Sequence, residues 1–244
     1  MHTRTFSGLA VAGMILWGFF SFAGCGSSTA NPDASGGGGK SGGAAGEIPI
    51  IAAPSSDVPY QFGMNGYGVA GGAFLAKANM GSQTIALDGT KAGRVCVSGT
   101  VDAVPTPADG SHPPYSDYWG IELGFNLNQG TDSVKNPWPV PSGVTGFWFT
   151  VEGAAIPPLR FKTTPNGKDP AQEQDSCALV MPSSGAVTQV LFSELYVQCW
   201  DGPQGTGTTD TSPGLLDVGL QVAASTDTVF PVDFCLTHFG LVTN

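Results

Sequence analysis

Hydrophobic residues alternate with small or polar residues in several short segments of the chain. In the clearest segment, 119–128, every second residue from Trp119 to Leu127 is apolar, and the residues between them are Gly, Glu or Asn. The same alternation occurs at 94–101, 144–152, 159–162, 187–192, 216–222 and 229–242. Successive strand residues point to opposite faces of a sheet, so a period of two predicts strands at these positions. Gly, Pro, Asn and Asp clusters between the segments predict turns.

Many short strands separated by turns predict an all-β sandwich or barrel. Each strand would turn its apolar face to the core and its other face to solvent. The residues predicted to face outward are small, amide-bearing or charged, with one aromatic, Trp148, among them. A surface of this kind leaves room for a ligand.

The first 24 residues have the layout of a secretory signal peptide. Arg4 precedes an apolar stretch of small and hydrophobic residues that ends in Phe22-Ala23-Gly24-Cys25. The stretch is short for a membrane span, which needs about 20 residues. The ending resembles the bacterial lipobox, with Phe22 at the position where Leu is usual, and the resemblance implies that Cys25 is lipidated. An ordinary signal peptide with an incidental cysteine is the alternative.

The composition of residues 25–57 predicts a flexible tether. Residues 58–244 are predicted to form a single domain. The tether is rich in Gly, Ser and Ala and has no hydrophobic periodicity, so it cannot bury enough surface to fold alone. The short apolar piece at 48–51 could dock on the domain or remain free. Gly26 follows the cysteine where an Asp would mark retention, which resembles the signal for outer-membrane export. We therefore expect a lipid-anchored, extracytoplasmic protein at the outer membrane or cell surface.

The charge balance argues against a nucleic-acid partner. All 19 acidic residues but only eight of the nine basic residues follow Cys25, so this part of the chain has a net charge of −11. Binding to a phosphate backbone requires a basic patch or stripe, and the sequence has none.

Four cysteines remain after Cys25, and an even number in an exported chain predicts two disulfides. Three connectivities are possible. We favour Cys96–Cys235, which joins an early strand to the last one, together with Cys177–Cys199, which closes a short loop. A zinc site is a weaker interpretation because no pair has CxxC spacing.

The order of motifs along 60–244 resembles the galactose-binding-like jelly rolls, and especially carbohydrate-binding modules and lipoprotein relatives of the kind found in myxobacteria. The motifs are GVTGFWFTVEG, PLRF, TQVLFSEL, CWD, LLDVGLQV and PVDFCLTHFGLV. The resemblance implies a jelly-roll β-sandwich of two antiparallel sheets, with a ligand platform on the concave sheet or at a loop edge. It also implies a possible structural calcium, for which Asp233 with Asp88 is the candidate pair. Calcium takes six to eight oxygen ligands. The alternative is that Asp233 only bonds the backbone.

A carbohydrate platform combines aromatic faces with a few placed polar groups. The aromatic candidates are Trp148 on an outward face, Trp200 in a loop fixed by a cysteine, and Tyr118, Tyr115 and Trp138 in loops. The polar candidates on outward faces are Glu122, Asn126, Asn128, Gln221 and Arg160. We expect the first four to share a face with Trp148. Lys162 is expected at a solvated strand edge.

Catalysis has little support in the sequence. A glycosidase needs two carboxylates about 5–9.5 Å apart, and no spacing singles out a pair among Glu122, Glu152, Glu194 and Asp201. The Gly-x-Ser-x-Gly nucleophile elbow of a serine hydrolase is missing from residues 58–244, and only His112 and His238 could serve there as the base. The sequence thus favours a surface-tethered, non-catalytic carbohydrate-binding lipoprotein without a required cofactor. A structural or adhesive envelope lipoprotein that binds a protein partner is the alternative.

Overall fold

The computed structural model describes residues 46–50, 67–78, 85–88, 93–105, 118–129, 134–167, 175–197, 199 and 209–244. All of these belong to the compact unit Gly42–Asn244. The predictions for residues 1–24, Cys25, Tyr115 and Trp200 lie outside the described residues. Among the described residues, no helix is long and apolar enough to cross a membrane.

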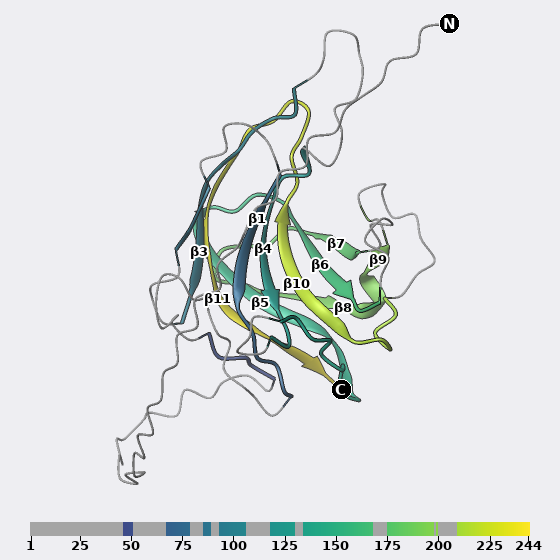
Figure 1. Cartoon of the computed structure of the whole chain (residues 1–244). Coiled ribbons are helices and arrows are strands. Elements are labelled where there is room, and N and C mark those ends of the chain that lie inside the picture. The colour runs from purple at the N-terminus through teal and green to yellow at the C-terminus, as the bar shows by residue number, and fades with distance from the viewer. Residues whose placement is uncertain are drawn as a thin grey trace, which may run out of the picture. The chain divides into compact units, whose positions relative to one another are not determined.

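Two antiparallel sheets form the domain, and together they confirm the predicted all-β jelly-roll sandwich (Figure 1). The six-stranded sheet has the order β1 (Ala73–Lys77), β4 (Ile121–Asn126), β10 (Leu215–Val222), β6 (Leu159–Pro165), β7 (Ser176–Val180) and β9 (Tyr196–Val197). The five-stranded sheet has the order β2 (Ala86–Asp88), β3 (Val95–Val101), β11 (Phe230–Thr243), β5 (Val144–Ala155) and β8 (Val187–Leu191). A 3₁₀ turn, η1 (Phe192–Glu194), follows β8.

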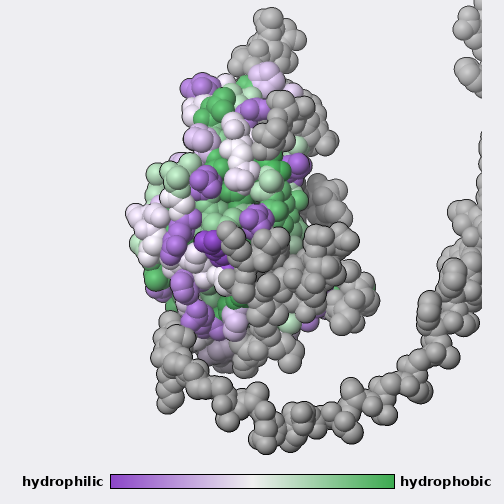
Figure 2. Space-filling view, turned by 90° about the vertical axis from the view of Figure 1, so that its left-hand side faces the viewer, coloured by the Kyte–Doolittle hydropathy of each residue, from purple (hydrophilic) through white to green (hydrophobic). Residues whose placement is uncertain are grey.

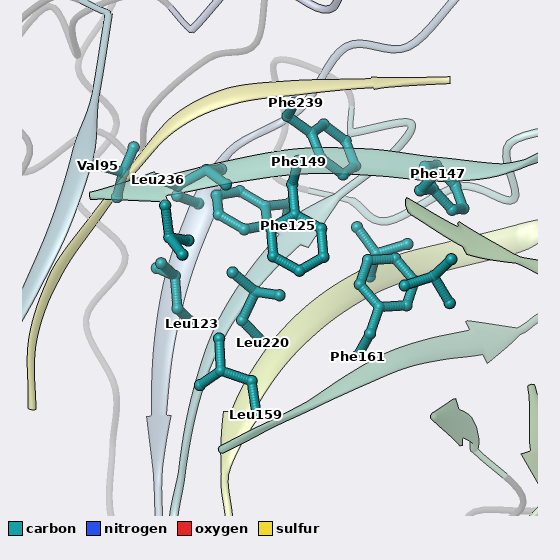
Figure 3. Packing of buried hydrophobic residues seen from close by; sticks show 14 of the residues in the cluster. Val95, Leu123, Phe125, Phe147, Phe149, Leu159, Phe161, Leu220, Leu236 and Phe239 are labelled. Carbon is teal, nitrogen blue, oxygen red and sulfur yellow. The ribbon is translucent and has the colours of Figure 1, made fainter. Parts of the chain in front are cut away.

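The core lies between the two sheets and consists of the apolar faces that the alternation predicts. Figure 3 shows Leu123, Phe125 and Leu220 of the six-stranded sheet pointing toward Phe149 and Phe239 of the five-stranded sheet. The rings pack closely, with centroids 5.9 Å apart for Phe125 and Phe239. Burial of these side chains supplies the main driving force that holds the two sheets together.

The predicted strands match β3, β4, β5, β6, β8, β10 and β11 within a few residues. Alternation failed to identify β1, β2, β7 and β9. Two of these, β2 and β9, have only three and two residues, which is too short for a period to show. The β7 sequence, Ser176–Val180, contains a run of three apolar residues and does not alternate.

The predicted start of the domain at residue 58 is wrong, because residues 46–50 belong to the fold. Ile48 is 1% exposed, and its backbone N–H donates to the Phe239 carbonyl at 2.8 Å. The Leu241 N–H in turn donates to the Gly46 carbonyl at 2.9 Å. β3 pairs with β11 only as far as Leu236. The segment therefore continues the line of β3 along β11, and its apolar side chains complete the core.

Both favoured disulfides are present. Cys96 and Cys235 lie directly opposite each other on β3 and β11, so their bond ties the last strand to an early one. Cys177 of β7 bonds Cys199, 22 residues further along the chain. The second disulfide holds the short edge of the six-stranded sheet beside β9.

Candidate functional site

The outer face of the six-stranded sheet carries two glycines side by side at its centre. Gly124 of β4 and Gly219 of β10 are directly paired in register. The ring of Phe74, which is opposite Gly124 on β1, lies over it, because a Cβ at Gly124 would come within 2.1 Å of the ring. The Glu122 carboxylate lies over Gly219 in the same way. Because glycine has no side chain, Gly124 and Gly219 leave a flat seat on the sheet for one aromatic ring and one carboxylate.

Lys162 of β6 joins this face through two ion pairs. Its ammonium lies 2.8 Å from a Glu122 oxygen and 3.0 Å from an Asp175 oxygen. Burial alone would lower the pKa of Lys162, but attraction to the two carboxylates outweighs burial and raises this pKa above its usual range. Burial raises the pKa of Glu122, against the opposing effect of the Lys162 ammonium. The prediction that Lys162 occupies a solvated edge is therefore wrong.

Lys135 covers Phe74 from the solvent side. Its ammonium lies 4.6 Å from the ring centroid, a cation–π distance, and 3.3 Å from a carboxylate oxygen of Asp217. The Lys135 side chain is half-exposed, so this is the part of the cluster with the greatest access to solvent. We name the group formed by Phe74, Glu122, Lys135, Lys162, Asp175 and Asp217 the β1–β6 cluster.

The predicted carboxylate candidate, Glu122, belongs to this cluster, and the amide candidates flank it, but these side chains are largely buried. Glu122, Asn126 and Gln221 are 7%, 5% and 3% exposed. β4 pairs with β1 on one side and with β10 on the other. On the outer face, the Phe74 ring and the Glu122 carboxylate cover the two glycines. The expectation that these groups face open solvent is therefore wrong. They support the surface from beneath, together with half-buried Arg160, which is opposite Gln221 in register.

The amide N–H groups donate to other groups of the fold. The Asn126 amide donates to the Gln129 side chain at 3.0 Å, and Gln221 donates to the Trp119 carbonyl at 3.0 Å. Asn128, which is half-buried, donates to the Pro137 carbonyl at 3.0 Å. The buried Oδ1 of Asn126 is one of two buried side-chain atoms in the described part of the chain that have no hydrogen-bond partner. Such an unpaired buried atom is uncommon in a folded protein.

Trp148 does not share a face with these groups. It alternates with Phe147 and Phe149, whose rings enter the core from β5, so it lies on the outer face of the five-stranded sheet. Glu122 and Asn126 lie on the outer face of the other sheet. The predicted pairing of Trp148 with the amides is therefore wrong. The Trp148 ring lies over Gly240 of β11, as the Phe74 ring lies over Gly124.

Of the remaining aromatic candidates, Trp138 is a core residue. It is 1% exposed, its ring packs 6.1 Å from that of Phe147, and its Nε1–H donates to the Tyr67 carbonyl at 2.9 Å. The prediction that it lines an edge site is wrong, because burial of a large ring with a satisfied N–H outweighs its position in a loop. Tyr118 is half-buried and lies just before β4.

Asp88 and Asp233 do not fit a shared calcium site. Asp88 is opposite Cys96, whereas Asp233 is opposite Ser98, and β3 lies between the two strands. Neighbouring strands are about 4.8 Å apart, so the two backbones are separated by about 10 Å across the sheet alone. Among the described residues, no three His, Cys, Asp or Glu side chains converge as a metal site.

The sequence interpretation missed Phe74, Lys135 and Asp175. Phe74 and its strand showed no alternation, and Lys135 and Asp175 lie outside every predicted strand. A usable signal was present in the two mid-strand glycines, since a glycine inside a strand often marks a place where another group approaches closely.

Comparison of the sequence with protein-family models and with curated proteins finds no match. Among solved structures, the chain is similar to a family 11 carbohydrate-binding module of a cellulosomal cellulase of Clostridium thermocellum, with 15% identity and a TM-score of 0.45 over 82% of this chain and 96% of that one. It is also similar to a family 11 module of Clostridium thermocellum in complex with a β-1,3-1,4-mixed-linked tetrasaccharide, with 14% identity and a TM-score of 0.44 over 82% and 98% of the two chains. A similarity at this level does not identify a ligand.

Proposed function

We propose that the protein is a surface-tethered lipoprotein whose jelly-roll domain binds carbohydrate without catalysis. The observation that carries this proposal is the β1–β6 cluster, in which an aromatic ring on a flat glycine seat adjoins a half-exposed ammonium and a carboxylate. Sugar rings offer an apolar C–H face and several hydroxyls, and they are recognised by aromatic faces with a few polar groups beside them. The two lysines and Arg160 balance the three carboxylates of this surface, which suits an uncharged ligand.

A sugar would replace the Lys135 ammonium over the Phe74 ring. The half-exposed Lys135 side chain can move aside and donate to a hydroxyl, and Asp217 can accept from one. The Glu122–Lys162–Asp175 ion pairs hold the floor of this surface rigid, which limits the ordering cost of binding. Two disulfides fit an oxidising extracytoplasmic compartment. The signal peptide and Cys25 would supply the membrane anchor, and a structural calcium remains a prediction.

The test uses the chain with Cys25→Ser, which blocks lipidation, on a glycan array and in pull-downs with insoluble polysaccharides. Each assay is run with calcium and with a chelator. Phe74→Ala and Trp148→Ala form a matched pair, because each removes an aromatic ring seated on a glycine but on opposite sheets. We expect Phe74→Ala to weaken binding at least tenfold and Trp148→Ala to leave it unchanged, with both variants folded by circular dichroism.

Failure of the folded, oxidised protein to bind any glycan would overturn the proposal and favour the envelope-protein alternative. Exposed apolar side chains support that alternative. Leu179 and Met181 at the end of β7 are 68% and 71% exposed. Figure 2 shows hydrophilic and hydrophobic side chains intermixed on the side of the molecule that faces left in Figure 1. Cross-linking in cells would then identify the protein partner.

A further inference from the structure

A second concave site lies where the edges of the two sheets approach each other. An open cavity of about 440 Å³ is lined by residues of β7 and β9 of the six-stranded sheet, of β8 of the five-stranded sheet and of η1. Its volume is within the range of small-molecule sites, which is about 300–1,000 Å³. None of the residues of the β1–β6 cluster lines it. The cavity is therefore a separate place on the domain.

The cavity combines an apolar floor with a few polar groups. Ala178 and Val180 of β7 and Val190 of β8 turn their side chains toward the core and form the floor, and the disulfide-bonded Cys199 closes one side. The polar lining consists of Gln189, Glu194 and Tyr196. Glu194 offers a carboxylate, and Tyr196 offers a phenol whose ring is the one aromatic ring among the described lining residues. Gln189 is opposite Trp148 of β5, so its amide lies on the outer side of its sheet, at the rim of the cavity. This is the mixture of groups that holds a ring with one apolar face and several hydroxyls.

The positions of the polar groups are fixed by the fold. The Glu194 carboxylate accepts the Leu191 N–H at 2.8 Å, which holds it at the start of η1 and leaves its other oxygen for a ligand. Tyr196 is directly opposite Cys177, whose disulfide to Cys199 ties down this edge. A site held in this way needs little ordering when a ligand enters.

We propose that this edge cavity binds a single neutral sugar residue, such as the end of an oligosaccharide. Among the described residues, the lining includes one carboxylate and no basic side chain, so a uronate or a sulfated sugar would meet an uncompensated negative charge. The inference rests on the proposed function and adds a second site, about one residue in size, with its own charge preference. Two sites on one domain would let a polysaccharide be held at two points, which raises the apparent affinity.

The experiment measures binding of the Cys25→Ser chain by calorimetry. The probes are neutral oligosaccharides of glucose, mannose, galactose and xylose, with oligogalacturonate as the acidic comparison. Gln189→Ala and Tyr196→Ala test the edge cavity, Phe74→Ala tests the β1–β6 cluster, and Ser98→Ala is the control on an exposed position of β3 in the same sheet as Gln189. Because Gln189 is exposed, its replacement does not threaten the fold even if that of Tyr196 does.

We expect Gln189→Ala and Tyr196→Ala to weaken binding of a neutral oligosaccharide at least fivefold, Ser98→Ala to leave it unchanged, and oligogalacturonate to bind at least tenfold more weakly. Sugar binding that is lost in Phe74→Ala but unaffected by both cavity variants would overturn the edge site and leave the proposed function standing. A complete lack of sugar binding would overturn both. Binding of an apolar dye that neutral sugars do not displace, and that Tyr196→Ala abolishes, would overturn the edge site in favour of an apolar ligand.

Discussion

Replacing Lys162 with Met tests whether the floor of the β1–β6 cluster is a buried, ionised network. Met keeps most of the aliphatic length but removes the ammonium that lies 2.8 Å from Glu122 and 3.0 Å from Asp175. The Glu122 side chain is only 9% exposed, so its carboxylate would be left buried without a cation. Breaking a buried ion pair in this way costs about 3–5 kcal/mol.

Protonation of Glu122 sets an upper limit on this cost. A carboxyl with an ordinary pKa of 4.5 can be kept neutral at pH 7 for about 3.4 kcal/mol, since each pH unit above the pKa corresponds to about 1.4 kcal/mol. In the variant, the pKa of Glu122 rises further in the folded state, so the folded protein binds a proton that the unfolded chain releases. Stability of the variant therefore falls as the pH rises above 4.5. We expect a loss of about 3 kcal/mol at pH 7 and of less than about 1 kcal/mol at pH 5.

Urea unfolding with intact disulfides, at pH 5, 6 and 7, measures this difference. The double variant Glu122→Gln/Lys162→Met should recover most of the stability at pH 7, because the buried charge is gone. Asp175→Asn should cost less than Lys162→Met, since the Asp175 side chain is 28% exposed and is solvated without its partner. A Lys162→Met variant as stable as the wild type, or one whose loss does not change with pH, would refute the reasoning.

Three further predictions concern the rest of the fold. Ile48→Ala should lower the free energy of unfolding by about 3 kcal/mol, because Ile48 is a core side chain of the 46–50 segment; urea unfolding checks this, and a neutral result would contradict the docked segment. Trp138→Phe should lower it by about 2 kcal/mol through loss of the bond to the Tyr67 carbonyl, and a thermal scan that shows no change would count against that bond. Replacing Cys96 and Cys235 by Ala should cost about 4–5 kcal/mol, because that disulfide closes a loop with a sequence separation of 139; a loss below about 1 kcal/mol in urea unfolding would contradict this estimate.

The local pattern predicts strands well but not the surroundings of their outer faces. Alternation in 119–128 and 216–222 correctly assigned Phe125 and Val218 to the core. It could not show that β4 and β10 would be neighbours, each flanked by a further strand. Burial of Glu122 and Gln221 follows from those neighbours and from the ring and ion pairs that cover the glycines. These contacts join residues far apart in the sequence, and no local pattern records them.

The error over Trp148 has a topological cause. Trp148 and Glu122 were both correctly predicted to point away from the core, but β5 and β4 belong to different sheets. In a sandwich, the outward faces of two sheets look in opposite directions. Successive strands such as β3, β4, β5 and β6 alternate between the sheets here. If the predicted strands are assigned alternately to the two sheets, Trp148 and Glu122 fall on opposite faces of the domain.

The glycine seats give a way to test the binding face without changing any group that a ligand would touch. Gly124 is directly opposite Phe74, and Gly240 is directly opposite Trp148, so in each case the ring comes from the neighbouring strand and lies over the glycine. A Cβ would come within 2.1 Å of the Phe74 ring at Gly124 and within 2.4 Å of the Trp148 ring at Gly240. Both substitutions to Ala must therefore lift a ring from its sheet, at a similar structural cost. If the β1–β6 cluster binds sugar, Gly124→Ala should weaken binding several-fold in the glycan pull-down, and Gly240→Ala should not. Equal effects of the two variants would mean that binding responds to stability in general and that the Phe74 ring is not the platform.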